Sequence, residues 1–139
     1  MKRTEYLEHT ADVLILAHGD NLAEAIAAAA DGMFEIITGH SSSGATGEPV
    51  TIEVDASDIE SLVVRFLSEL VVRHEIDRVV MSDFTVEMLP CFRLRATARA
   101  FPFDERQDSE GSHVKGIPYH LLEINDLDGA ASVRVLFDI

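Results

Sequence analysis

The feature that most restricts the fold is the second half of the sequence, where strand patterns follow one another with no helix between them. Residues 79–89 and 91–103 have the composition of long strands separated by Pro90, and residues 117–124 and 131–139 have that of a final pair. A doubly wound sheet needs a helix between successive strands, and this half of the chain does not supply one. The order of patterns therefore favours an α+β domain.

Two helical patterns lie in the first half of the chain, over residues 19–39 and 57–77. In both, apolar residues recur every three or four positions, as on the buried face of an amphipathic helix. Asn21 is in place to cap the first helix and Gly39 to end it. A Ser-x-x-Glu capping box predicts that the second helix is capped by Ser57.

Shorter patterns complete the expected fold. The Ser- and Gly-rich segment 40–49 reads as a mobile surface loop and the polar segment 104–116 as a connection. The remaining segments with the alternation of strands are 3–8, 12–17 and 50–56. We expect two helices packed on antiparallel or mixed β-sheets in a compact sandwich. No repeat or linker divides the chain, so we expect one domain over residues 1–139.

The net charge restricts the partners of the protein. There are 11 Lys and Arg residues against 25 Asp and Glu, which gives a formal charge of −14 at pH 7. Nucleic-acid affinity comes mostly from Lys and Arg side chains that displace counterions from the phosphates. We therefore expect no direct binding of nucleic acid, and any role in RNA or DNA metabolism to pass through a protein partner.

The single cysteine, Cys91, excludes an internal disulfide and a cysteine-based zinc site. Its place in a strand pattern predicts a small buried side chain. The sequence opens with no basic and apolar signal segment, and no run reaches the ~20 apolar residues of a membrane span. We expect a soluble, cytoplasmic protein that does not contact membranes.

The patterns of common hydrolases are absent. His74 and Glu75 are followed by "IDR", which breaks the HExxH pattern, and "GHSSSG" lacks the spacing of a GxSxG elbow. No nucleophile, base and orienting acid converge in the sequence, so the residues alone predict no catalytic site.

Two acids at opposite ends of the chain are candidates for a metal site. Asp12 follows a short polar stretch between two apolar runs, and it is either a ligand for a hard metal or a solvated turn residue. Asp138 precedes the terminal carboxylate of Ile139, so two anionic groups lie one residue apart. A divalent ion would offset their repulsion, because calcium and magnesium prefer oxygen ligands, but an exposed chain end explains them as well.

The final hairpin adds a geometric hint about Lys115. The Asp-Gly pair in "NDLDG" predicts a tight turn. If Asn125 faces Ala130, the pairing runs back so that Asp138 falls opposite Ile117 and Lys115 lies near the chain end. The lysine would then offset the acidic charge or donate to an anionic ligand, or it would form an ordinary surface salt bridge.

Several of these stretches together resemble the archease family in order and spacing. They are YLEHTADV near the start, LAEAIAAAADGMFEIIT and LVVRFLSELVVRHEID in the two helical patterns, FPFDER, VKGIPYHLLEI and the final VRVLFDI. The resemblance covers nearly the whole chain, and its opening and closing motifs are the most specific. It implies a compact sandwich of helices and sheets, similar to a domain of a redox-regulated chaperone.

By this resemblance the protein is not an enzyme but a cofactor protein of an RtcB-type RNA ligase in tRNA splicing and RNA repair. Proteins of the family promote guanylylation of the ligase, allow multiple turnover and broaden its nucleotide use. An alternative is a general chaperone or interaction module with an incidental metal site. A stand-alone metal-dependent hydrolase is a third hypothesis, for which the sequence offers acids but no base or nucleophile.

The resemblance also implies the residues of the site. The family carries a divalent-metal site, assigned to calcium, made from the acid of the HTAD motif and the end of the chain. Here these ligands correspond to Asp12, Asp138 and the main-chain carboxylate of Ile139. Lys115 corresponds to a family lysine and is a further candidate functional residue. Pro118 stands where the family has threonine, and because proline lacks a backbone N–H, local strand pairing is expected to differ.

Overall fold

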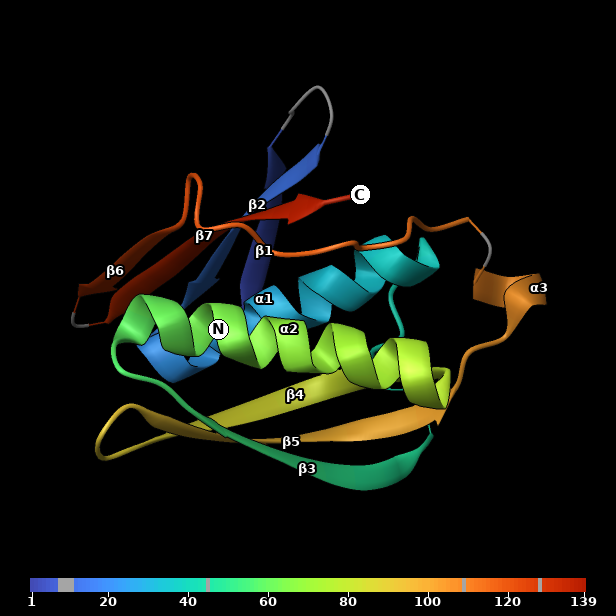
Figure 1. The fold of residues 1–139 in the computed structure, drawn as a ribbon, viewed down its shortest axis with the longest axis horizontal. Coiled ribbons are helices and arrows are strands. Elements are labelled where there is room, and N and C mark those ends of the chain that lie inside the picture. Colours follow the sequence, from blue (N-terminus) through green and yellow to red (C-terminus); the bar gives the residue numbers. More distant parts are fainter. Residues whose placement is uncertain (8–11, 45, 109, 128) are drawn as a thin grey trace.

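The computed structural model has three layers, with the two long helices between two β-sheets (Figure 1). It describes residues 1–7, 12–44, 46–108, 110–127 and 129–139. The helices are α1 (Leu22–Thr38), α2 (Ile59–Asp77) and the short α3 (Glu105–Asp108). The strands are β1 (Arg3–Leu7), β2 (Asp12–Gly19), β3 (Glu48–Asp55), β4 (Val79–Leu89), β5 (Arg93–Pro102), β6 (Glu123–Leu127) and β7 (Ala130–Asp138). The predicted α+β sandwich is confirmed.

Every strand pairing among the described residues is antiparallel. One sheet has the strand order β1-β2-β7-β6 and the other β3-β5-β4. The first sheet joins the two ends of the chain, because β2 pairs with β7 from Asp12 opposite Asp138 to Gly19 opposite Ala131. The candidate site therefore lies in this four-stranded sheet.

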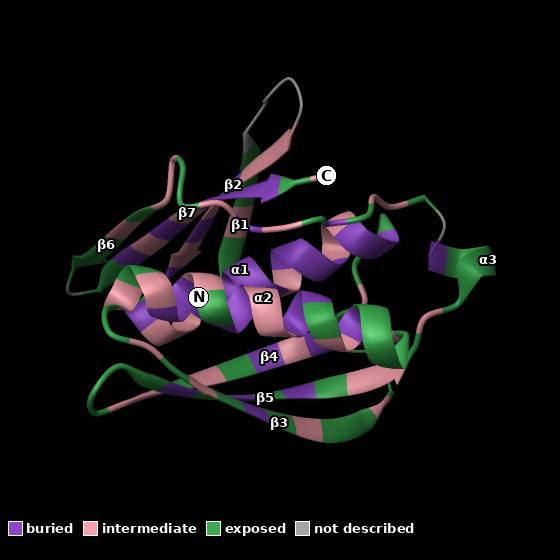
Figure 2. Ribbon diagram, viewed as in Figure 1, coloured by how far each residue is buried: buried purple, intermediate pink, exposed green. Residues whose placement is uncertain are grey.

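Helix α1 is buried on almost all sides because alanine dominates its middle. A helix that is apolar all round belongs in the interior, and residues 25–30, which are all buried, let both sheets approach closely (Figure 2). The predicted ends are confirmed: Asn21 accepts a hydrogen bond from the Glu24 N–H at 2.9 Å, and Gly39 ends the helix with φ 83°. Among the described residues, neither α1 nor any other helix is long and apolar enough to cross a membrane.

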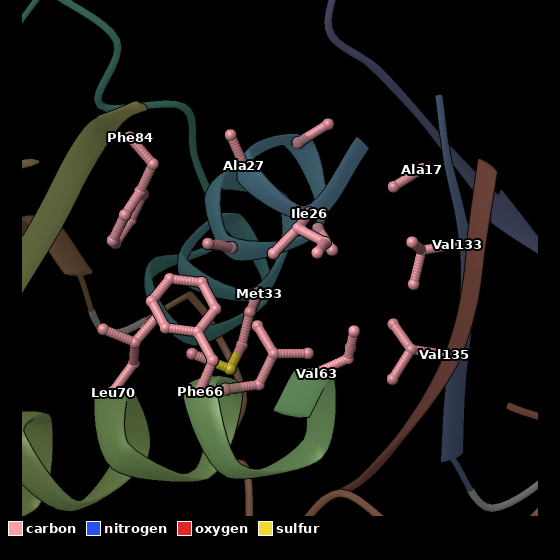
Figure 3. Packing of buried hydrophobic residues seen from close by; sticks show 14 of the residues in the cluster. Ala17, Ile26, Ala27, Met33, Val63, Phe66, Leu70, Phe84, Val133 and Val135 are labelled. Carbon is pink, nitrogen blue, oxygen red and sulfur yellow. The ribbon is translucent and has the colours of Figure 1, made fainter. Parts of the chain in front are cut away.

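The centre of the core lies where α1, α2 and β4 meet (Figure 3). Phe84 of β4 stacks on Phe34 of α1, with ring centroids 6.0 Å apart, and meets Phe66 of α2 edge-on at 6.2 Å. On the other side of α1, Val133 and Val135 of β7 complete the packing. This packing holds β7, and with it the end of the chain, against α1.

Helix α2 begins one residue later than the capping box predicted. Its N-cap is Asp58, in an extended conformation, and the Asp58 carboxylate accepts a hydrogen bond from the Ser61 N–H at 2.8 Å. This bond lowers the pKa of the Asp58 carboxyl. The prediction of a cap at Ser57 was wrong because serine and aspartate cap equally well and the two stand side by side.

The turn between β4 and β5 contradicts the prediction for Cys91. Its side chain is exposed rather than buried, and it lies in a turn rather than in a strand. Cys91 and Phe92 have positive φ angles, 63° and 52°, which extended strands do not allow. The apolar residues after Pro90 thus belong to the reversal of the chain and not to the strand that follows it.

The region before β6 differs most from the prediction. Residues 117–122 form no strand, and β6 covers only Glu123–Leu127. Asn125 lies opposite Ser132 rather than Ala130, because the turn is tighter than we predicted. The apolar residues in this stretch alternate because some of them are buried in the core, not because they pair in a sheet.

Polar contacts attach residues 40–44, the first part of the segment expected to be a mobile loop, to the rest of the surface. The Asp83 carboxylate accepts hydrogen bonds from the Ser43 O–H at 3.2 Å and the Gly44 N–H at 3.0 Å. His40 Nε2 lies 2.6 Å from Oδ1 of Asp108, a buried residue of α3. The hydrogen bond to Asp108 raises the pKa of His40, which favours an ion pair.

The His40–Asp108 contact predicts a pH-dependent contribution to stability. The pKa of His40 in the folded state lies above its unfolded value of about 6.5, so the contribution is complete below that value and is lost as pH rises through the folded-state pKa. We expect His40→Ala to lower the urea midpoint of unfolding more at pH 6 than at pH 9, with His120→Ala, at an exposed position, as the control. Equal losses at both pH values would contradict a role for the charge of His40.

Candidate functional site

Asp12 and Asp138 are neighbours on adjacent strands. Asp12 is the first residue of β2 and Asp138 the last of β7, and they lie directly opposite each other in the register. Residues in this relation have Cβ atoms about 4.5–5.5 Å apart and share one face of the sheet. The fold thus brings together two carboxylates from opposite ends of the sequence.

The two acids project away from the core. The next pair in the ladder, Val13 opposite Phe137, belongs to the hydrophobic core. Because side chains alternate between the faces of a strand, Asp12 and Asp138 lie on the other face. Asp138 is exposed and Asp12 is partly buried. Like charges directly opposite each other destabilise a sheet, so this pair favours a neighbouring cation.

Ile139 follows Asp138 directly after the end of β7. Its side chain packs against the core, and Phe137, on the other side of Asp138, is fully buried. Asp138 therefore stands between two anchored residues. The side-chain carboxylate of Asp138 and the main-chain carboxylate of Ile139 leave the same end of β7.

A segment of residues 112–117, here called the strap, runs past this end of β7 (Figure 1). The Lys115 N–H donates to the Asp138 carbonyl at 2.7 Å, and the Asp138 N–H donates to the Gly116 carbonyl at 3.0 Å. The prediction that Lys115 lies near the chain end is confirmed, although Asp138 pairs with Gly116 and not with Ile117. The Lys115 side chain is exposed.

The hydrogen bonds to the strap also show which type of pair the two acids form. In an antiparallel ladder, the N–H and C=O of one residue point to the same side of the strand. Both groups of Asp138 bond to the strap, so the Asp12–Asp138 pair across the other side is of the non-hydrogen-bonded type. Side chains come closest in pairs of this type.

The donor set of this end of the sheet fits a hard divalent cation with an open coordination shell. Its three carboxylates supply only oxygen, and calcium takes about six to eight oxygen ligands. Among the described residues, no group of three His, Cys, Asp or Glu side chains is placed to hold an ion alone. Residues 8–11, which include the first three residues of the HTAD motif, lie outside the described residues. Metal binding by Asp12, Asp138 and Ile139 stays a prediction.

The strap is the part of this site that sequence patterns missed. Segment 104–116 was expected to be a polar connection, but it contains α3 and ends in the strap. Val114 and Ile117 are buried in the core, at 2% and 7% exposure. Val114, an isolated apolar residue in the polar segment 104–116, was the available signal, because it anchors main chain that would otherwise be free. Ile117 belonged instead to the strand expected over residues 117–124.

The sequence and the fold are both similar to those of known proteins. The model of the Archease protein family (MTH1598/TM1083) matches residues 5–139. Protein archease from Pyrococcus abyssi is 36% identical over 143 residues, which cover 100% of each chain. The solution structure of Methanobacterium thermoautotrophicum protein 1598 is 28% identical, with 98% of each chain covered and a TM-score of 0.80. A Thermotoga maritima archease, named as a possible chaperone, shares the fold at 16% identity and TM-score 0.65, over 96% of this chain and 94% of that one. This chain is therefore a member of the archease family.

Proposed function

We propose that this archease is a protein cofactor, and not itself an enzyme, of an RtcB-type RNA ligase in tRNA splicing and RNA repair. It acts in the cytoplasm, where it promotes guanylylation of the ligase and multiple turnover through protein–protein contact. The observation that carries the proposal is the pairing of Asp12 with Asp138 on the outer face of the sheet, in a chain of this family. The position leaves the carboxylates within reach of another protein.

Asp12, Asp138 and the carboxylate of Ile139 are the proposed ligands of a divalent ion, calcium by family resemblance. When bound, the ion supplies positive charge for phosphate oxygens of the ligase's nucleotide. The carboxylates hold and orient one side of the site, and they leave the other side open to the partner. In this proposal the ammonium of Lys115, an exposed residue, contacts a phosphate or balances the acidic charge.

The charge of the chain supports a basic protein partner. A formal charge of −14 attracts a ligase surface that is itself basic because it binds RNA. Complementary charge raises the rate of encounter and fixes the orientation of the two proteins. The same charge repels RNA, so the proposal includes no direct RNA contact by this chain.

The test is a ligation assay with the cognate ligase in excess of this protein and RNA ends in excess of both. A ligase that has stopped after its first round should resume when sub-stoichiometric archease is added, and product should exceed the amount of ligase. The rate of ligase guanylylation, measured with labelled nucleotide, should rise in parallel. A ligase that stays stopped and unmodified would contradict the proposal.

General chaperone activity is the second candidate, and the name of the Thermotoga maritima relative favours it. It predicts that the protein suppresses aggregation of unfolded clients unrelated to RNA ligation. Suppression of client aggregation without any effect on the ligase would replace the cofactor proposal with this one. Stimulation of the ligase without protection of unfolded clients would exclude general chaperone activity.

A further inference from the structure

The strap is attached to the fold at both of its ends. At its start, the Ser112 N–H donates to the Ile36 carbonyl of α1 at 2.8 Å. Val114 and Ile117 are buried on either side of the two residues that bond to Asp138. The strap is therefore a rigid piece of main chain although it belongs to no regular strand.

Both main-chain hydrogen bonds of Asp138 go to the strap. β2 pairs with it on one side through Asp12, and the strap binds both its N–H and its C=O on the other. Terminal residues fray unless they are tied down. Without the strap, the last residues of β7 would have no main-chain hydrogen bonds at Asp138, because the pair with Asp12 supplies none.

We propose that the main chain of the strap is the positioning element of the acidic site. The Lys115 N–H and the Gly116 carbonyl set the direction in which the Asp138 and Ile139 carboxylates leave β7. Lys115 thereby has a main-chain role that is separate from its ammonium. The expected effect of the strap on metal binding rests on the proposed metal site. Its expected effect on the order of the chain end does not.

Two substitutions at one position separate these roles. Lys115→Ala removes the ammonium and keeps the N–H that donates to Asp138, whereas Lys115→Pro removes both. Groups that orient metal ligands typically change metal affinity about 10–100-fold when they are lost. We expect the calcium Kd of Lys115→Pro, measured by titration calorimetry, to exceed that of Lys115→Ala by about tenfold or more.

The matched control removes an equivalent hydrogen bond far from the site. The Gln107 N–H donates to the Asp104 carbonyl at 3.0 Å in α3, and the Gln107 side chain is exposed. Gln107→Pro and Gln107→Ala should therefore differ by no more than about twofold in calcium Kd, as expected for surface changes away from the site. A tenfold difference in this pair as well would overturn the positioning role, because it would show a general loss of stability.

A second readout needs no metal. In chelator, the Asp138 amide should exchange its hydrogen about tenfold faster in Lys115→Pro than in Lys115→Ala, as expected when an ordering hydrogen bond is lost. If the wild-type protein binds no calcium, the proposed metal site is wrong, and the exchange rate of the Asp138 amide alone tests whether the strap positions the chain end. Equal exchange in the two variants would overturn the inference even if calcium binds.

A further variant keeps the test open if Lys115→Pro does not fold. Ile117→Ala removes a buried anchor of the strap and keeps every main-chain hydrogen bond donor, and Ile117→Val restores most of the packing. We expect weaker calcium binding and faster Asp138 exchange in Ile117→Ala, with rescue in Ile117→Val. Calcium affinity and exchange equal to wild type in Ile117→Ala would contradict the positioning role.

Discussion

Asp138→Asn is expected to abolish stimulation of the ligase while the protein remains folded. Asparagine has the shape of aspartate but lacks the charge that a hard cation requires. Because loss of a group that merely orients a ligand costs about 10–100-fold in metal affinity, loss of the ligand itself should cost at least about 100-fold. Sub-stoichiometric Asp138→Asn should then produce no more product than the ligase alone in the multiple-turnover assay.

Stability should change in the opposite direction from activity. One of two facing carboxylates is removed, so the urea midpoint in chelator should stay at the wild-type value or rise, by up to about 1 kcal/mol in free energy of unfolding. Asp126→Asn is the control, because it removes an exposed acid from β6 in the same sheet. Full stimulation by Asp138→Asn would contradict the metal-site hypothesis, and so would equal loss in the control.

Gly111→Ala is expected to lower the free energy of unfolding more than the addition of one methyl group at any other position. A Cβ at this position would collide with the main-chain carbonyl of Ile37 at the end of α1. Main chain at a helix end cannot move aside as a flexible side chain does, so we expect a loss of about 3 kcal/mol or more in free energy of unfolding. Urea denaturation followed by circular dichroism measures this loss.

Another glycine of the same connection provides the comparison. A Cβ on Gly116 would have no atom within 4 Å. Gly116→Ala should therefore leave the free energy of unfolding within about 0.5 kcal/mol of wild type. A loss in Gly111→Ala no larger than that in Gly116→Ala would show that α1 and the start of the strap separate easily. The strap would then be a looser attachment than its hydrogen bonds indicate.

Local patterns predicted the helices well because burial and capping both act over a few residues. Asn21 and Gly39 marked α1 correctly, and only the choice between Ser57 and Asp58 was wrong. The errors at Cys91 and before β6 have a common cause, since an apolar residue can be exposed in a turn or buried without a strand. Sequence alternation does not distinguish these cases.

Local sequence patterns predicted the candidate site less well than the helices. Each of Asp12 and Asp138 alone has an ordinary explanation as a polar residue at the end of a strand. Their pairing depends on β2 meeting β7, which no nearby residues encode, and only the family resemblance joined them in advance. The two hydrogen bonds of the strap to Asp138 could not be predicted, because they involve main chain and so leave no trace in residue type.

The pairing of β2 with β7 has a consequence for the order of folding. β4 and β5 are joined by a short turn, whereas β2 and β7 lie more than 100 residues apart and must close a far longer loop. In pulse-labelled hydrogen exchange during refolding, amides of β4 and β5 should gain protection before those of β2 and β7. The pairing of Asp12 with Asp138 then forms later than the β4–β5 sheet, so a partly folded chain lacks the acidic pair on which the proposed function depends.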